Sequence, residues 1–97
     1  MRIIAKRTLR EFWQQHADVQ PALEEWHLNT EKADWRTPND ITRTVPQARS
    51  LGQDRFSFKI KGNQYRLIVK VNFAYQVVYI RFVGTHAQYD KIDANTI

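Results

Sequence analysis

Lysine and arginine residues near the middle of this 97-residue sequence have types and spacing suited to chemistry on phosphate groups. Lys59 and Lys61 stand two residues apart, and Arg66 follows after the pair Gly62-Asn63. Cations fixed in this way can stabilise the negative charge that builds up on phosphoryl oxygens in a transition state. Loss of one preorganised donor of this kind costs about 3–4 kcal/mol of transition-state stabilisation. We therefore interpret Lys59, Lys61 and Arg66 as candidate phosphate-binding groups.

Two residues near the end of the sequence carry groups that can transfer protons. His86 and Tyr89 are three residues apart, and Asp90 stands where it could orient His86 across one helical turn. Cleavage of RNA without a metal ion requires a 2′-hydroxyl to lose its proton, attack the neighbouring phosphorus and expel the 5′-oxygen. Together with the three cations, His86 and Tyr89 supply the kinds of group that this reaction needs.

Each of these residues also has a purely structural explanation. Exposed lysines commonly keep the edge of a sheet soluble, and Arg66 could pair with Asp54 or Asp90. Tyr89 could fill a gap over the sheet with its hydroxyl in water, and His86 alone is more often structural than catalytic. The residues by themselves therefore leave two alternatives open: an enzyme that acts on RNA, or a module that only binds nucleic acid.

The stretch from Arg55 to Lys70 (RFSFKIKGNQYRLIVK) must position the cations. Two runs of alternating apolar and polar residues flank Gly62-Asn63, which predicts a β-hairpin whose register is fixed by a two-residue loop. One face of the hairpin is then apolar and the other basic, without an acidic residue in the stretch. Like charges opposite one another destabilise a strand pair, so this face is predicted to receive an anion. The predicted pairs are Arg55–Lys70, Phe56–Val69, Phe58–Leu67, Lys59–Arg66, Ile60–Tyr65 and Lys61–Gln64.

The composition indicates one small basic domain that spans residues 1–97. Fifteen Lys and Arg residues against ten Asp and Glu residues give a net charge of +5, and the hydrophobic content of 42% is enough for a core. A basic protein of this kind favours an anionic partner, more often nucleic acid than a membrane surface. Without cysteine, and with three scattered histidines, neither a metal nor a cofactor is expected. Since no signal peptide or membrane-spanning run is recognisable, a cytoplasmic protein is expected.

The remaining sequence predicts an α+β fold: a mainly antiparallel sheet of three to five strands with two N-terminal helices packed on one face, in the order β-α-α-β-β-β. Asp18 is expected to cap the second helix, His27 to lie on the surface, and the three tryptophans to anchor the core. The predicted segments are a strand over 1–6, a helix from residue 7, a second helix to about residue 34, an irregular connection over 35–54 with one helical turn after Thr37, the hairpin, a strand over 76–83 and a short turn capped by Thr85.

At these same residues the sequence resembles a known family. The stretches FSFKIKGNQYRLIVKVNF and VYIRFVGTHAQYDKI are similar to those of the HigB toxins, members of the RelE-like superfamily of type II toxin–antitoxin systems. The pattern GN-x-YRL-[IV] and the later TH-x-x-YD are specific in combination. The resemblance covers nearly the whole chain, although residues 34–54 match only loosely.

The resemblance implies an mRNA interferase, a metal-independent endoribonuclease that inhibits translation. It implies mRNA, the A site and RNA of the ribosome, and a cognate HigA-type antitoxin as partners, and no membrane. The alternative is a non-catalytic module that binds nucleic acid or the antitoxin, having kept the fold and lost the chemistry. Carried over by position, the catalytic residues are Lys59, Lys61, Arg66, His86 and Tyr89, with His86 in place of the late cation of RelE-like toxins. Apart from this resemblance, four other basic residues are further RNA-binding candidates: Arg55, Lys70, Arg81 and Lys91.

Overall fold

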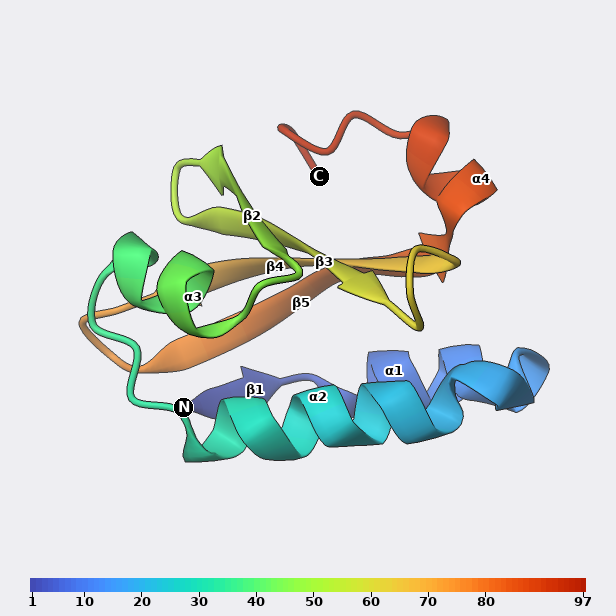
Figure 1. Ribbon diagram of the computed structural model, residues 1–97, viewed down its shortest axis with the longest axis horizontal. Coiled ribbons are helices and arrows are strands. Elements are labelled where there is room, and N and C mark those ends of the chain that lie inside the picture. The colour runs from blue at the N-terminus through green and yellow to red at the C-terminus, as the bar shows by residue number, and fades with distance from the viewer.

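A computed structural model, which describes all 97 residues, shows a five-stranded mixed sheet with two N-terminal helices on one face (Figure 1). The elements are β1 (Arg2–Ile4), α1 (Lys6–Gln15), the 3₁₀ turn η1 (Ala17–Val19), α2 (Gln20–Lys32), α3 (Pro38–Thr44), β2 (Ala48–Gly52), β3 (Arg55–Ile60), β4 (Tyr65–Asn72), β5 (Val77–Thr85) and α4 (His86–Asp90). The strands lie in the order β1-β5-β4-β3-β2, with β1 parallel to β5 and every other pair antiparallel. The predicted α+β class, the mainly antiparallel sheet and the helical face are confirmed.

Helices α1 and α2 each turn one apolar stripe toward the sheet (Figure 1). Leu9 and Leu23 are fully buried there, and the predicted tryptophan anchors Trp13, Trp26 and Trp35 are only 9%, 7% and 5% exposed. Burial of a large apolar side chain contributes about 1.5–3 kcal/mol, so this layer fixes the sheet firmly. The inner face of the sheet supplies Phe56, Phe58, Ile60, Tyr65, Leu67, Val69, Val71 and Val78. None of the helices is long and apolar enough to cross a membrane.

The hairpin of β3 and β4 has the register that its alternating residues predict. Lys59 lies opposite Arg66, Phe58 opposite Leu67, and Arg55 opposite Lys70. The inward side chains are buried, since Phe58 is 1% and Leu67 is 0% exposed. Because side chains alternate between the two faces of a strand, Lys59, Arg66 and their neighbours at every second position face away from α1 and α2.

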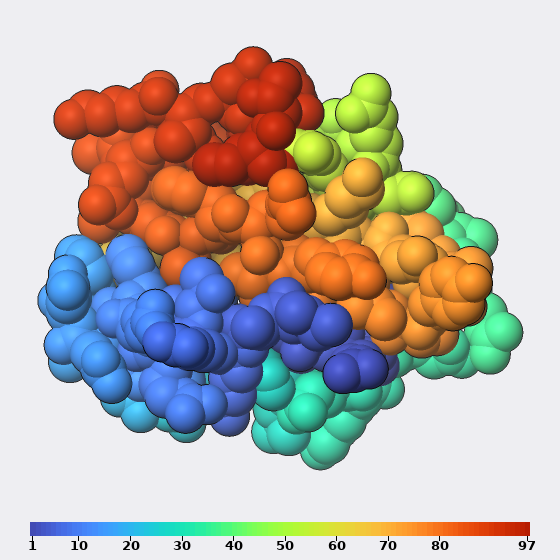
Figure 2. All heavy atoms as spheres, turned by 180° about the vertical axis from the view of Figure 1, so that it is seen from behind, coloured from blue at the N-terminus to red at the C-terminus, as the bar shows by residue number.

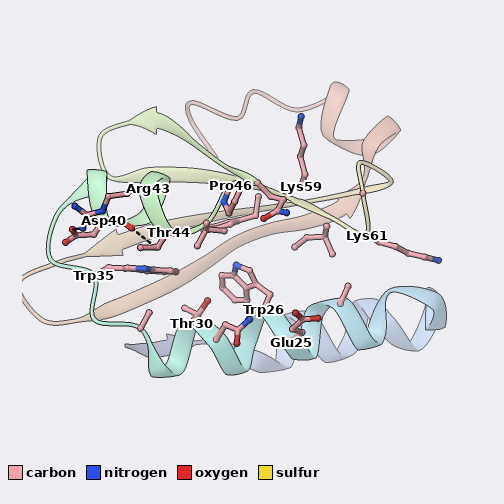
Figure 3. Close-up of a pocket in the computed structure, with 18 of the residues that line it drawn as sticks. Glu25, Trp26, Thr30, Trp35, Asp40, Arg43, Thr44, Pro46, Lys59 and Lys61 are labelled. Atoms are coloured by element: carbon pink, nitrogen blue, oxygen red, sulfur yellow. Dashed lines mark hydrogen bonds and ion pairs between the residues drawn. The ribbon is translucent and has the colours of Figure 1, made fainter.

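The loop between β3 and β4 differs from the predicted two-residue turn. The strands end at Ile60 and begin again at Tyr65, so the connection comprises residues 61–64. Lys61 has a φ of 52° and Gly62 a φ of 67°, both in the left-handed region. The strand alternation therefore stops before Lys61, whose side chain leaves the hairpin in another direction than that of Lys59 (Figure 3).

Two predictions for the helical layer were wrong. Asp18 does not cap α2, because the helix begins at Gln20 after the turn η1 and receives no side-chain cap. His27 is buried rather than on the surface, with 7% of its area exposed and its Nδ1 3.3 Å from Glu31 Oε1. Helix α2 packs against α1 as well as the edge strand β1 of the sheet, so a wider part of its surface is covered than one apolar stripe requires.

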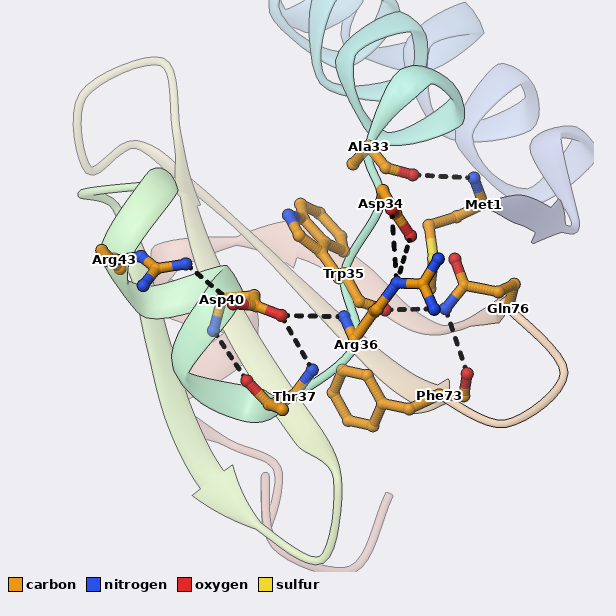
Figure 4. Close-up of polar contacts among 10 residues, drawn as sticks. All are labelled: Met1, Ala33, Asp34, Trp35, Arg36, Thr37, Asp40, Arg43, Phe73 and Gln76. Carbon is orange, nitrogen blue, oxygen red and sulfur yellow. Dashed lines mark hydrogen bonds and ion pairs between the residues drawn. The ribbon is translucent and has the colours of Figure 1, made fainter.

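The segment that precedes the hairpin is more regular than predicted. After Thr37, which caps the first turn together with Asp40, α3 extends for seven residues and stops before Pro46, and β2 then forms the edge of the sheet. Asp40 also accepts hydrogen bonds from the backbone N–H groups of Arg36 (2.9 Å) and Thr37 (3.0 Å), as Figure 4 shows. These bonds hold the pKa of the Asp40 carboxyl below its usual value.

The outer face of the sheet is covered only in part. Helix α4 packs on β5 and β4, and the residues after it continue along the same side (Figure 1). Figure 2 shows, from behind, this C-terminal segment (red) on one side of β5 (orange) and α1 (blue) on the other. The cover buries Ile68 completely and Phe82 partly, while basic side chains at the margin of the cover stay accessible.

Candidate active site

Four basic side chains share the outer face of the β3–β4 hairpin: Arg55, Lys59, Arg66 and Lys70, which we call the basic face. Lys59 and Arg66 are direct cross-strand neighbours, as are Arg55 and Lys70. No carboxylate side chain forms an ion pair with any of the four. Adjacent like charges that no acid relieves are unfavourable in a sheet, and an anion bound between them removes that penalty.

Arg66 is held in place without losing its capacity to bind an anion. Its Nε donates a hydrogen bond to Asn63 Oδ1 at 2.8 Å, and its guanidinium carbon lies 4.7 Å from the centre of the Tyr89 ring. The stacking is a cation–π contact, which favours a guanidinium over the ring face. Both Nη groups make no hydrogen bond within the chain, so the fork that suits a phosphate remains available.

The C-terminal helix brings Tyr89 to Arg66 and begins at His86, beside the β3–β4 loop. Pairing of β4 with β5 places Gly84 opposite Arg66 and Thr85 opposite Tyr65, and α4 starts immediately afterwards. The backbone N–H of His86 donates to Gln64 O at 3.0 Å, which ties the start of α4 to the β3–β4 loop. The Tyr89 ring lies 6.5 Å from that of Phe82.

Helix α4 has a well-defined start and a carboxylate beside its histidine. Thr85 Oγ1 accepts from the Gln88 N–H at 3.1 Å, and Gln88 Oε1 accepts from the Thr85 N–H at 2.8 Å, so the predicted cap is confirmed as a capping box. His86 Nδ1 lies 3.6 Å from Asp90 Oδ2. Asp90 therefore lies beside the imidazole without a hydrogen bond to it, and its role in orienting His86 stays a prediction.

Gly84 lets α4 approach the sheet closely. A Cβ atom at this position would lie 2.6 Å from Phe82 Cζ and 2.8 Å from Gln88 Oε1. Both distances are too short for carbon contacts, so a larger residue would displace the ring or break the capping box. The glycine thus belongs to the support of His86 and Tyr89.

Lys61 lies apart from the basic face. Its Nζ is 2.7 Å from Asp18 Oδ2, and Tyr65 donates its hydroxyl to Asp18 Oδ1 at 2.8 Å. The hydrogen bond from Lys61 and then that from Tyr65 lower the pKa of the Asp18 carboxyl, and the bond to Asp18 raises the pKa of Tyr65. The structure therefore does not bring Lys61 together with Lys59 and Arg66.

The predicted RNA-binding residues lie around the site to different extents. Arg55 donates to Ile97 O and keeps its Nε buried without a partner. Lys70 and Arg81 line a shallow hollow of about 540 Å³ with Tyr79, and Arg81 is the extra residue of a bulge in β5. Lys91 is exposed directly after α4.

Sequence reasoning missed the residues that support the site: Asn63, Gln64 and Asp18. The sequence predicts Asn63 only as part of the turn, although an asparagine in a turn three residues before an arginine is a signal for such a contact. The contacts of Asp18 and Gln64 join segments far apart in the sequence, and no local pattern indicates them. No group of three histidine, aspartate or glutamate side chains converges to hold a metal ion.

A mixed sheet backed by two N-terminal helices, with basic residues on its outer face and a short C-terminal helix beside them, defines a protein of the RelE-like class. Residues 19–92 match the family HigB_toxin, described as the RelE-like toxic component of a toxin–antitoxin system. The chain belongs to this family of toxins. The matched segment includes β3, β4, β5 and α4, and with them every predicted catalytic residue.

A curated relative is similar over almost its whole length. The mRNA interferase HigB of Escherichia coli O6:H1 (strain CFT073) is 25% identical over 99 residues, which covers 95% of this chain and 91% of that protein. Membership in a toxin–antitoxin family implies an antitoxin as partner, and the name of the relative connects such a toxin with mRNA.

Proposed function

We propose that this toxin is a metal-independent endoribonuclease that cuts mRNA engaged in the A site of the ribosome, and that a cognate HigA-type antitoxin neutralises it. The proposal rests on the family and on the relative named as an mRNA interferase. At the level of the structure, one observation carries it: Arg66, stacked on Tyr89 and opposite Lys59, presents a free guanidinium fork where no carboxylate competes.

The two cations would hold the scissile phosphate. Lys59 and Arg66 are placed by backbone pairing, so little reorganisation is needed as charge develops on the phosphoryl oxygens. Arg66 offers two parallel N–H groups to two oxygens, and Lys59 offers a point charge. Lys70, Arg81 and Lys91 would bind flanking phosphates, whereas the predicted role of Arg55 stays a prediction, since its guanidinium donates to Ile97 O. Lys61 belongs to the predicted site by resemblance and stays a prediction, since its amine is engaged by Asp18.

His86 and Tyr89 would move the protons. One group removes the proton of the 2′-hydroxyl, whose oxygen then bonds to phosphorus, while the bond from phosphorus to the 5′-oxygen breaks and that oxygen takes up a proton. The products are a 2′,3′-cyclic phosphate and a 5′-hydroxyl. Asp90, 3.6 Å from His86, would stabilise an imidazolium. Tyr89, whose ring carries Arg66, can also stack on a base.

Purified protein tests the proposal with ribosome-engaged mRNA. The wild-type protein is expected to cleave the message, and Arg66→Ala to reduce the rate about 10²–10³-fold, as loss of one preorganised donor does. His86→Ala is expected to abolish most activity as well, and both variants should keep the far-UV circular dichroism of the wild type. Wild-type cleavage by both variants would reject this site.

Two further comparisons separate the parts of the proposal. Cleavage with and without ribosomes tests ribosome dependence directly. Replacement of the 2′-hydroxyl at the cut position by hydrogen removes the nucleophile, so the message should then stay intact at that position. If the wild-type protein instead binds RNA in a salt-dependent manner and leaves it uncut, the fold serves as a binding module without catalysis.

A further inference from the structure

A shallow hollow lies at the end of β4 and β5 that is remote from α4. Its volume is about 540 Å³, which is within the range of small-ligand sites in proteins. Lys70 and Tyr79 are direct cross-strand neighbours there, and Arg81 follows on β5. Figure 1 shows β5 leading from the turn beside this hollow to α4, so one strand connects the hollow with the candidate active site.

Tyr79 is an exposed aromatic residue whose ring has no partner within the chain. It is 37% exposed, and its ring neither pairs with another aromatic ring nor carries a cation. Tyr89, in contrast, carries Arg66, and Tyr65 is bonded to Asp18. Stacking of a nucleic-acid base requires an accessible ring face and accepts any base, because every base has a π face. Tyr79 therefore offers a platform for a base.

The basic side chains beside Tyr79 are available to an anion. Lys70 and Arg81 are both exposed, and neither forms an ion pair within the chain. Asp54, the acidic residue of the hollow, accepts the N–H of Val71 through its backbone carbonyl at 2.8 Å, while its carboxylate pairs with neither base. The hollow thus has an excess of positive charge beside a free aromatic ring, and this combination favours a nucleotide over an apolar peptide.

Outer side chains of β5 connect the hollow with the candidate active site. Phe82 follows Arg81 directly, and its ring lies 6.5 Å from that of Tyr89, which carries Arg66. On β4, Lys70 stands four residues after Arg66, which corresponds to about 13 Å at the rise of a β-strand. An RNA strand held at Arg66 can therefore reach the hollow with its flanking nucleotides.

We propose that the hollow holds one nucleotide of the mRNA strand that the active site cuts, with its base stacked on Tyr79 and an adjoining phosphate between Lys70 and Arg81. The inference rests on the proposed function, because it takes the bound strand to be the message. It gives Tyr79, which lies outside the predicted site, a role in substrate binding. Since stacking tolerates any base, the hollow strengthens the hold on the message without selecting a codon.

Two exposed tyrosines provide matched variants. Tyr75 is 79% exposed in the turn between β4 and β5 and does not line the hollow, so Tyr75→Ala removes a ring outside the proposed site. Tyr79→Ala removes the proposed platform, and Tyr79→Phe keeps the ring and removes only its hydroxyl.

The probe is ribosome-engaged mRNA whose A-site codon carries 2′-O-methyl groups, so that it cannot be cut and the codon fixes the register of the strand. A series of such messages has one abasic nucleotide at successive positions beside that codon. The readouts are the affinity of the fluorescently labelled protein for each complex, its affinity for ribosomes without a message, and cleavage of unmodified message.

We expect Tyr79→Ala to bind the message complex about fivefold to 150-fold more weakly, which is the loss that removal of one stacking ring causes. Tyr79→Phe and Tyr75→Ala should keep the wild-type affinity. One abasic position should weaken binding of the wild-type protein by a similar factor, and this effect should vanish in Tyr79→Ala, because the missing base and the missing ring belong to the same contact. In cleavage of unmodified message, Tyr79→Ala should raise KM more than it lowers kcat.

Wild-type affinity of Tyr79→Ala, or an abasic effect that persists in this variant, overturns the hollow alone, while cleavage by the wild-type protein still supports the proposed function. An equal loss of affinity for ribosomes with and without a message overturns the proposal in favour of ribosomal RNA. A loss of affinity only for the protein encoded next to the toxin gene overturns it in favour of a protein partner. The expected stacking effects without cleavage support the hollow and reject the catalytic function, and a wild-type protein that neither binds nor cuts the message rejects both.

Discussion

Lys59 and Lys61 stand two residues apart but have different surroundings. One is available to an anion, and the other supports the structure of the site. Lys59 is exposed beside Arg66 and forms no ion pair, whereas Lys61 is bound to Asp18 at 2.7 Å. A cation engaged by a carboxylate is less available to a phosphate. The Asp18 contact instead anchors the loop that carries Asn63, whose side chain holds Arg66.

Comparison of Lys61→Ala with Asp18→Ala distinguishes the two roles of Lys61. If Lys61 acts only through its ion pair, both variants loosen the same loop and should lower kcat/KM for ribosome-engaged mRNA by a similar modest factor. If the amine of Lys61 leaves Asp18 to bind the phosphate, Lys61→Ala should lower kcat/KM by about 10²–10³-fold and Asp18→Ala should lower it much less. From the geometry we expect the first result. Single-turnover cleavage and thermal unfolding of the two proteins provide the measurement.

His27 makes the stability of the fold depend on pH. Burial lowers the pKa of His27, because the imidazolium loses its hydration, and this effect exceeds the opposing one of Glu31. Because the pKa of His27 is lower in the folded protein, the free energy of unfolding is highest above the unfolded-state pKa of about 6.5. It decreases as the pH falls below that pKa, since the unfolded chain then binds the proton more readily than the folded one. The melting temperature should therefore drop between about pH 8 and about pH 5, and His27→Gln should show a smaller drop. Equal drops in the two proteins would show that other groups carry the dependence.

At the scale of elements, α4 is the least independently stable part of the site. It has five residues and no buried side chain, so the capping box, the His86 N–H bond to Gln64 and the close approach at Gly84 must hold it. Helices this short are not stable in isolation. The position of His86 and Tyr89 thus depends on a few contacts with β4, β5 and the loop between β3 and β4.

Gly84→Ala tests this dependence. The added methyl would meet Phe82 Cζ at 2.6 Å and Gln88 Oε1 at 2.8 Å, so the ring and the capping box must shift and α4 must move with them. We expect a loss of cleavage of at least tenfold with only a small decrease in melting temperature, because the core between the helices and the sheet is untouched. Gln88→Ala, which removes the capping contact without a clash, should have an intermediate effect. Full activity of Gly84→Ala would contradict the dependence.

The elements that the sequence predicts well are those whose pattern depends on immediate neighbours. Alternation along β3 and β4 predicts the pairing of Lys59 with Arg66, because burial of one face repeats at every second residue. Strand β2 shows no such alternation in ARSLG and exists through its pairing with β3, a tertiary effect. The direction of Lys61 depends on a left-handed backbone that the residue type does not favour.

Local sequence patterns predict only part of the candidate site. Arg66, His86 and Tyr89 can be selected by type and by resemblance, but their proximity depends on the register of β4 and β5. The extra residue Arg81 shifts that register by one between Val69 and Ile68, and without it Arg66 would lie opposite Val83 rather than Gly84. A bulge of this kind follows from the fit of whole strands, which spacing along the chain does not reveal.

Across the whole molecule, the charges are divided between the two layers. Seven of the ten acidic residues precede residue 41, in or near the helical layer, whereas residues 55–91 contain seven bases and a single acid. Because six bases accompany those seven acids before residue 41, the helical part is close to neutral, and the sheet side carries the excess of positive charge that attracts a polyanion. The acidic residues in question are Glu11, Asp18, Glu24, Glu25, Glu31, Asp34 and Asp40.

The salt dependence of RNA binding measures this difference in charge between the sheet side and the helical side. Single-stranded RNA with 2′-O-methyl groups cannot undergo cleavage, so its affinity can be measured with the active protein by fluorescence anisotropy over a range of salt concentrations. Each phosphate contact contributes about 0.7 to the slope of log K against log salt for a single strand. Lys70→Gln, on the basic face, should reduce the slope by about that amount, whereas Lys32→Gln, at the end of α2, should leave it unchanged. If both variants have the wild-type slope, Lys70 makes no phosphate contact; if both lower it equally, RNA does not distinguish the sheet side from the helical side.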